Sequence, residues 1–428
     1  MDFEIPDRIK DGYGINESII EQAHADGVEV ILTCDNGISA FHQVELAKKY
    51  GMTVVITDHH EVPLDGEKEK IPPADAVIDP KQAACPYPFP EICGAVVAYK
   101  LVQVLYARRG VPQMEWLDLL EFAAIATVGD VMKLQDENRI LVKYGLKKMA
   151  QTKNLGLRRL AEKNNLDLGA ITAYHIGFVI GPCLNAGGRL KTAKEALALL
   201  RAQSEEEAER LAEELKELND TRKDMTEQGT EAAKLQVESW YQKDKVLVVF
   251  LPDCHESLAG IVAGRLRERY NKPSYVLTRA EGCVKGSGRS IEYHMFKKLT
   301  EVSDLLLKFG GHPLAAGLSL EEKNIDEFRR RLNENAGLTE EDFKAKVWID
   351  VPMPVGYVTE RLVRELSCLE PFGQGNEKPL FAEKSLRIRA SRVLGRNRNV
   401  VKMTLEETDG HAIEALYFGD GTAFEEER

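Results

Sequence analysis

The hydrophobic positions near the start of the chain form short continuous runs separated by amphipathic stretches. Residues 28–33 and 52–57 are apolar runs typical of strands buried on both faces, and residues 39–50 between them predict a helix. Residues 76–78 form a third short run, and residues 16–26 predict a helix ahead of the first. Strands that alternate with helices at this spacing predict a parallel sheet of βαβ units, and hence an α/β fold.

Helical spacing dominates the middle of the chain. We expect helices at 93–108 and 116–127 and a long amphipathic helix over 194–240, broken near Gly229, in which Leu211, Leu215 and Leu218 share one face. Residues 181–190, GPCLNAGGRL, are rich in glycine. We predict a loop there that enters a helix near Thr192, a turn being favoured over a phosphate cradle. Residues 1–15, with Pro6, Gly12 and Gly14, predict turns and no regular element.

Two further patterns follow the long helix. A strand at 246–250, a helix at 258–270 and a strand at 274–277 predict a second α/β domain. After residue 340 the runs VWIDV, LRIRASRVL, NVVKMTLEET and HAIEALYF alternate or form short β segments between turns. They predict a small antiparallel domain, a five-stranded barrel of a class often used for single-stranded nucleic acid.

Composition places few limits on function. The 428 residues are 43% hydrophobic and 29% charged, which is typical of a soluble globular protein of two to four domains. No apolar run has the length of a membrane span and the first residues lack a signal-peptide pattern, so we expect a cytoplasmic protein. Seven cysteines without a C-x-x-C pair predict reduced thiols. The net charge of −12 is unlike that of most nucleic-acid binders, but an acidic metal site can coexist with a basic groove.

The strongest chemical signal lies where the first strands end. Asp58, His59 and His60 follow the run 52–57, and Asp35 follows the run 28–33. Because open α/β sheets bind ligands at the carboxyl ends of their strands, Asp35 and Asp58 are expected at one edge, where they could share a divalent metal ion. Asp130 follows a helix and a glycine, and alone it is more often a turn or cap residue than a ligand.

Two glycine motifs in the second α/β domain suggest a phosphate site. Residues 286–290, GSGRS, and residues 310–317, GGHPLAAG, combine small residues with one donor each, Arg289 and His312. Small residues let backbone approach a ligand, and both donors suit phosphate. Each motif alone favours a tight turn, whereas the pair in one domain favours a ligand.

The sequence resembles the RecJ branch of the DHH phosphoesterase superfamily in an ordered set of residues and motifs: Asp35, DHH, Asp130, GPCLNAGG, SGRS and GGHPLAAG. The resemblance extends to PDRIKDGYGIN, NDTRKD, DCHESLAGIVAGRL and PFGQGN. It implies a single-stranded-DNA exonuclease that works 5′ to 3′ by two-metal catalysis in DNA repair and recombination. It also implies four parts: a parallel-sheet DHH domain (1–192), a connecting helix (193–243), a smaller α/β DHHA1 domain (244–340) and an OB-fold-like barrel (341–428).

The resemblance assigns a role to each candidate residue. Asp35 would bridge two Mn²⁺ or Mg²⁺ ions, and His59 and Asp130 would hold the second ion. Asp58 would orient His59, and His60 would sit beside the scissile phosphate. The implied nucleic-acid-binding residues are Asn185, Arg189, Arg289, Gly310, Gly311 and His312.

The chain departs from the family pattern in two places. Cys183 stands where many relatives have an arginine, which would remove one phosphate contact. The family's first motif, Asp-x-Asp-Gly, occurs nowhere in the 428 residues. We therefore expect the first strand to be missing and nuclease activity to be impaired. Because the sequence stops soon after a predicted strand, we also expect the last domain to be incomplete.

The implied partners are single-stranded DNA and, as further candidates, a helicase or a single-strand-binding protein; we expect a monomer without membrane association. Two alternatives remain. A DHH phosphodiesterase acting on short oligonucleotides or cyclic dinucleotides is disfavoured by the β domain after residue 340. A nuclease-dead protein that binds single-stranded nucleic acid is mildly disfavoured by the presence of Asp35, His59, His60 and Asp130.

Overall fold

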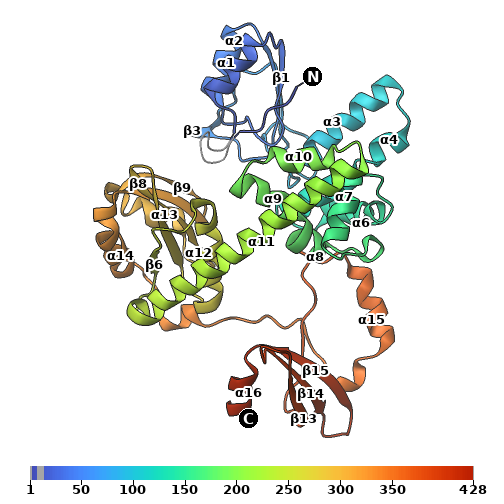
Figure 1. Cartoon of the computed structure of the whole chain (residues 1–428), viewed down its shortest axis with the longest axis vertical. Coiled ribbons are helices and arrows are strands. Elements are labelled where there is room, and N and C mark those ends of the chain that lie inside the picture. Colours follow the sequence, from blue (N-terminus) through green and yellow to red (C-terminus); the bar gives the residue numbers. More distant parts are fainter. Residues whose placement is uncertain (1, 7–13, 428) are drawn as a thin grey trace. The chain divides into compact units, whose positions relative to one another are not determined.

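The computed structural model describes residues 2–6 and 14–427, in two compact units (Figure 1). The first unit runs to Met132 and then from Asp136 to Ala345, and the second combines Lys133–Gln135 with the chain from Lys346 onwards. The turns predicted at residues 7–13 lie outside the described residues. None of the helices in the described ranges has the length and hydropathy that crossing a bilayer requires.

The first sheet has three parallel strands in the order β1-β2-β5, as the apolar runs predict. The prediction that the first run is buried on both faces is wrong, because Val30 and Leu32 of the edge strand β1 are each 58% exposed. The elements of this region are α1 (Glu17–Ala25), β1 (Val30–Leu32), α2 (Phe41–Lys49), β2 (Thr53–Thr57), β5 (Ala76–Ile78) and a separate hairpin of β3 (Leu64–Asp65) and β4 (Lys68–Glu69). Apolar side chains of α1, α2, β2 and the residue before β2 form its core: Ile20, Val44, Ala47, Met52, Val54 and Ile56. Asn16 caps α1 by accepting the backbone N–H of Ile19.

A helical region follows this sheet. It consists of α3 (Gly94–Arg109), α4 (Gln113–Leu117), α5 (Leu120–Gly129), α6 (Asp136–Met149), α7 (Leu155–Lys163), α8 (Ala173–His175), α9 (Gly181–Leu190) and α10 (Lys194–Leu200). The helices predicted at 93–108 and 116–127 correspond to α3 and α5. The second starts later than expected because residues 113–117 form the separate short helix α4.

Residues 181–190, which we predicted as a loop, are helical. The helix α8, a π-helical segment η2 (Ile176–Ile180) and α9 follow one another without a break. Pro182 lies in the first turn of α9, where proline is well tolerated. A Cβ atom at Gly187 would lie 2.8 Å from the carbonyl oxygen of Thr192, so this glycine allows close packing. The loop prediction is wrong because these residues serve packing rather than turns.

The next helix, α11 (Glu205–Gln236), has 32 residues. Ser204 caps it by accepting the N–H of Glu207, and its buried face includes Ala208, Leu211, Ala212 and Leu215. The predicted break near Gly229 is wrong. The interruption lies at residues 201–204 instead, between α10 and α11. A Cβ atom at Gly229 would lie 3.3 Å from Val262, so this glycine serves the packing of α11 against α12.

The second sheet has the order β6-β7-β8-β10-β9, with β6 and β7 parallel and the other pairs antiparallel. Its elements are β6 (Leu247–Phe250), α12 (Ala259–Tyr270), β7 (Ser274–Ala280), β8 (Cys283–Arg289), α13 (Met295–Thr300), β9 (Leu306–Gly311), β10 (Ala315–Leu320) and α14 (Ile325–Glu334). One core joins the sheet to α11 and α12, and the other joins it to α13 and α14. Helices therefore cover both faces, as in other α/β domains.

The glycine motifs of this domain lie mostly in strands. Residues 286–289 belong to β8, whereas Gly310 and Gly311 end β9, and His312 begins the hairpin to β10. A Cβ atom at Gly288 would lie 2.6 Å from the ring of Tyr275, and one at Gly286 would overlap Leu277. The first motif is thus not a tight turn. Its two glycines make room for core side chains.

The second unit is mainly β structure. It contains β11 (Val351–Pro352) paired in parallel with β12 (Phe381–Ala382), and the antiparallel sheet β13 (Arg387–Leu394), β14 (Val400–Glu406) and β15 (Ala412–Phe418). The helices α15 (Glu360–Leu366) and α16 (Gly421–Glu427) complete it. The antiparallel segments agree with the predicted ones, except that the run 347–351 enters a strand only at Val351. The five strands form two hydrogen-bonded sheets rather than one.

Candidate metal and phosphate site

The side chains predicted at the edge of the first sheet lie together. Asp35 follows β1 with a φ of 64°, and its N–H donates to the carbonyl oxygen of Thr57 at 3.0 Å. Asp58, His59 and His60 follow β2 directly. Because β1 and β2 are parallel neighbours, both groups stand at the same carboxyl edge.

His59 lies between two carboxylates. Its Nε2 atom is 3.0 Å from Oδ1 of Asp35 and 3.5 Å from Oδ2 of Asp130, the residue that caps the end of α5. Burial disfavours the charged ring, but the hydrogen bond to Asp35 and the charges of both carboxylates outweigh it and raise the pKa of His59. Burial, together with the charge of Asp35, raises the pKa of Asp130. The three groups form a compact, electrostatically coupled cluster.

Asp58 is buried and binds its own loop. Its carboxylate accepts the backbone N–H of Ile38 at 2.9 Å and that of His59 at 2.8 Å, and lies 2.7 Å from Nδ1 of His60. Burial opposes ionisation, but these hydrogen bonds outweigh it and lower the pKa of Asp58. We expected Asp58 to orient the ring of His59. It orients the ring of His60 instead, and contacts only the backbone of His59.

The cluster fits a divalent metal ion. Ligand atoms of Asp35, His59 and His60 lie within 4.8 Å of one another. The Asp35 and Asp130 side chains remain 56% and 49% exposed, so an ion can reach them, whereas His59 is nearly buried. The group of Asp35, His59 and His60 offers one carboxylate and two imidazoles, and Asp130 adds a second carboxylate 3.5 Å from Nε2 of His59. Such donors suit Mn²⁺ and, through the oxygens, Mg²⁺.

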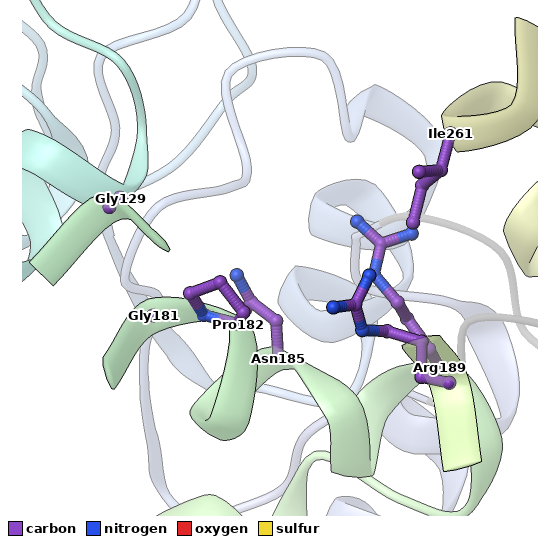
Figure 2. Close-up of a pocket in the computed structure, with 8 residues that line it drawn as sticks. Gly129, Gly181, Pro182, Asn185, Arg189 and Ile261 are labelled. Carbon is purple, nitrogen blue, oxygen red and sulfur yellow. The ribbon is translucent and has the colours of Figure 1, made fainter. Parts of the chain in front are cut away.

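A polar pocket of about 190 Å³ reaches Gly129, the residue before Asp130 (Figure 2). It is lined by Gly129, Gly177, Gly181, Pro182, Asn185, Arg189, Arg222 and Ile261. Figure 2 shows the Asn185 side chain rising from α9 into the space between Gly129 and Arg189. Gly129 immediately precedes Asp130, so the pocket begins one residue from the proposed metal ligands.

Two arginines give the pocket its positive charge. Arg189, which the sequence singled out, donates from Nη1 to the carbonyl oxygen of Ser257 at 2.9 Å. Arg222 lies on α11 and donates from Nε to Oδ1 of Asn219 at 3.0 Å. Burial, together with the charge of Arg265, lowers the pKa of Arg222, and no carboxylate of the described residues forms an ion pair with it. A half-buried cation without a paired carboxylate favours an anionic ligand.

Sequence reasoning named the NDTRKD motif, which contains Arg222, but gave it no role. The signal was an arginine inside a motif on an otherwise solvated helix. Cys183, in contrast, is not among the residues that line the pocket. It is fully buried, and the Asn219 side chain donates to its sulfur at 3.3 Å. The expected loss of a phosphate contact at Cys183 stays a prediction, and Arg222 is an arginine of the pocket that the sequence analysis had not assigned.

The third group of predicted residues lies at the end of β8 and β9. Arg289 pairs with Ala315 of β10, and Gly311 pairs with the next residue, Ala316, so these positions share one end of the sheet. The N–H of His312 donates to the carbonyl oxygen of Ala315 at 2.8 Å and closes the hairpin.

Arg289 and Arg189 approach the same turn. A Cβ atom at Gly260 would lie 2.7 Å from Nη2 of Arg289, and Arg189 binds Ser257 three residues earlier. Both arginines therefore lie close to the segment 257–260 at the start of α12. A ligand with phosphates at several points could bind both.

Three sequence models of protein families match the chain. The DHH family, N-terminal domain, matches residues 1–127; the DHHA1 domain matches residues 243–337; and the RecJ OB domain matches residues 349–428.

Curated relatives carry the name single-stranded-DNA-specific exonuclease RecJ. The relative from Bacillus subtilis is 37% identical over 98% of this chain and 53% of its own length. Those from Haemophilus influenzae and Escherichia coli are 33% and 34% identical over 99% of this chain and 76% of their own lengths. The chain thus spans about half of the Bacillus protein.

Solved structures show the same likeness. RecJ from Thermus thermophilus in complex with Mn²⁺ superposes with a TM-score of 0.78 at 28% identity, over 94% of this chain and 63% of that one. An exonuclease RecJ bound to manganese gives a TM-score of 0.66 at 31% identity, over 79% of this chain and 83% of that one.

Proposed function

Because the chain belongs to the RecJ family of single-stranded-DNA-specific exonucleases, we propose that it hydrolyses single-stranded DNA from 5′ to 3′ with Mn²⁺ or Mg²⁺. The observation that carries this proposal is the convergence of Asp35 and Asp130 on Nε2 of His59. A pocket with two arginines reaches the residue before Asp130, which supports a phosphodiester substrate.

The metal ligands we propose are Asp35, His59 and Asp130, with Asp35 shared between two ions. When bound there, the ions supply Lewis-acid polarisation of the phosphodiester and activation of water. The high exposure of Asp35 and Asp130 leaves room for the substrate, and the burial of His59 fixes the direction of its ring.

Asp58 and His60 act as a pair in this proposal. Since a carboxylate can only accept, Nδ1 of His60 donates to Asp58, and Nε2 remains available to a phosphate oxygen. The hydrogen bond to Asp58 raises the pKa of His60 against the effect of burial, which favours a ring able to donate.

The phosphate contacts we propose lie along the pocket and the end of the second sheet. Asn185 and Arg189 serve the phosphates nearest the metal ligands, and Arg222 adds a charge that sequence reasoning had not assigned. Arg289 and His312 serve phosphates further along, while Gly310 and Gly311 shape the hairpin.

A digestion assay tests the proposal. A 5′-phosphorylated single strand with a 3′ fluorophore, incubated with Mn²⁺, should shorten progressively from its 5′ end, whereas a blunt duplex should persist. His59→Ala should abolish shortening. His24→Ala, which alters an exposed histidine of α1, should leave the rate unchanged. Release of the fluorophore as the first product would contradict the proposed polarity.

Binding without cleavage is the second candidate, because no Asp-x-Asp-Gly occurs in the 428 residues. This candidate predicts that the strand is retained in a mobility-shift assay with Mn²⁺ and stays intact. A phosphodiesterase for short oligonucleotides would instead cleave dinucleotides and leave a 20-nucleotide strand untouched. The match to the RecJ OB domain favours a longer strand.

We propose a role in DNA repair and recombination in the cytoplasm, as a monomer that meets a helicase or a single-strand-binding protein on DNA. The RecJ family match supports this role. Sedimentation of the chain with each purified candidate partner tests it. If the chain and the candidate partner sediment separately in every mixture, without a faster complex, the partner assignment is contradicted.

A further inference from the structure

Two exposed aromatic rings lie on the helical run that lines the polar pocket of Asn185 and Arg189. Tyr174 is 63% exposed and Phe178 is 67% exposed, and their ring centroids lie 4.7 Å apart with 27° between the planes. The opposite face of the same helical run is anchored in the core by Ile176, Ile180 and Cys183. The aromatic pair therefore takes no part in the core, although it exposes costly apolar surface.

The pair shares a helix face with the pocket. Tyr174 and Phe178 are four residues apart, Pro182 follows after four more, and Asn185 and Arg189 follow after three and four. Residues at these spacings lie on one side of a helix. Pro182, Asn185 and Arg189 line the pocket, as does Gly177 beside Phe178. The face thus carries aromatic rings at one end and, at the other, the N–H groups of Asn185 and Arg189, which can donate hydrogen bonds to phosphate.

The local backbone supports a binding role. The residues that carry the rings adjoin and enter the π-helical segment Ile176–Ile180, in which the N–H of Gly181 donates to the carbonyl oxygen of Ile176. Segments of this kind are rare and frequent at functional sites. From Phe178 to Arg189 a helix rises roughly 16 Å, which matches several stacked nucleotides at about 3.4 Å each.

We propose that Tyr174 and Phe178 form a stacking platform for the bases of the single strand whose phosphates bind Asn185 and Arg189. This inference rests on the proposed function and adds the part of the ligand that is recognised: the unpaired base. Aromatic stacking is tolerant of sequence, because every base offers a π face. A paired base in a duplex has its faces covered by its neighbours, so the platform also favours single strands.

The test compares two strands with the same backbone. The chain of 428 residues is titrated, in the presence of EDTA, with a 20-nucleotide thymidine strand and with an abasic strand of equal length. Phe178→Ala should weaken binding to the thymidine strand roughly fivefold or more and leave the abasic strand unaffected. Tyr174→Ala should act in the same direction, whereas Phe178→Trp and Tyr174→Phe should retain affinity. The slope of log affinity against log salt should be the same for these variants as for the unsubstituted chain, since no charge is lost.

A matched control is Trp240→Ala, because Trp240 is 70% exposed and also lies in a π-helical segment, Val237–Tyr241. It should leave both affinities unchanged. If Phe178→Ala binds both strands as the unsubstituted chain does, or loses affinity for both equally, the platform is excluded while the proposed function stands. If the unsubstituted chain binds neither strand, the proposed function itself fails. Fluorescence quenching of the Phe178→Trp ring by thymidine but not abasic strand gives an independent readout.

Discussion

Gly94, the first residue of α3, leaves the space that Asp35 occupies: a Cβ atom added at Gly94 would lie 2.7 Å from the Cα atom of Asp35 and would overlap its carboxylate. Asp35 itself holds a left-handed backbone conformation with a φ of 64°. The position of the carboxylate thus depends on a missing side chain in another element.

Gly94→Ala should therefore displace Asp35 and lower Mn²⁺ affinity about tenfold or more, as loss of supporting contacts does at metal sites. Isothermal titration with Mn²⁺ measures this effect. The control is Gly264→Ala in α12, where a Cβ atom meets nothing within 4 Å. It should keep the affinity and gain up to about 1 kcal/mol of helix stability. Equal affinities of the two variants would contradict the role of Gly94.

His59→Ala and Asp130→Ala should each lower the cleavage rate about 100-fold or more, and the double variant should be scarcely slower than either single one. The two side chains lie 3.5 Å apart and are proposed ligands of the same ion, so their effects should not add. The rates of all four proteins in one double-mutant cycle measure this coupling. Additive losses would show that the residues act at separate sites.

Arg222→Ala should weaken binding of single-stranded DNA for every sequence and reduce the slope of log affinity against log salt by about 1, as loss of one phosphate contact does. Arg289→Ala should do the same. Arg330→Ala is the control, because Arg330 is ion-paired with Glu327 and Glu334 on α14 and lies outside the pocket. A binding titration at four salt concentrations measures the slope for each variant. An unchanged slope for Arg222→Ala would exclude a phosphate contact.

Glu121→Gln should gain stability relative to the unsubstituted chain as the pH rises. Glu121 is buried on α5 and accepts a hydrogen bond from Thr152 at 2.7 Å, while burial raises its pKa. A carboxyl group with a raised folded-state pKa favours folding below its unfolded pKa and loses that contribution as the pH rises through the folded value. Urea unfolding of both proteins at pH 5 and pH 8 measures the difference. A difference that is independent of pH would contradict ionisation of Glu121.

The edge of the first sheet could be predicted from sequence because its chemistry is local. Asp35 and Asp58 each follow an apolar run, and parallel pairing of the two runs brings their ends together without further information. Asp130 could be placed beside them only by family resemblance. Its approach to His59 depends on how α5 packs, and apolar periodicity does not specify that packing.

Glycine-rich segments were predicted less well, since glycine permits both turns and close packing. Residues 181–190 have the composition of a loop, but form a helix whose glycines face neighbouring backbone. Arg222 was missed for a related reason. A charge on a long polar helix indicates solvent exposure, unless the surface that covers it is known.

The glycines of β8 have a consequence for the evolution of this family. Gly286 and Gly288 make room for Leu277 and Tyr275, whatever Arg289 binds. Selection for a folded sheet alone would preserve both glycines, even in a descendant that had lost Arg289 and its ligand. Invariance at these two positions would therefore reflect only the packing of the protein interior, and invariance of Arg289 alone would reflect selection for a bound ligand.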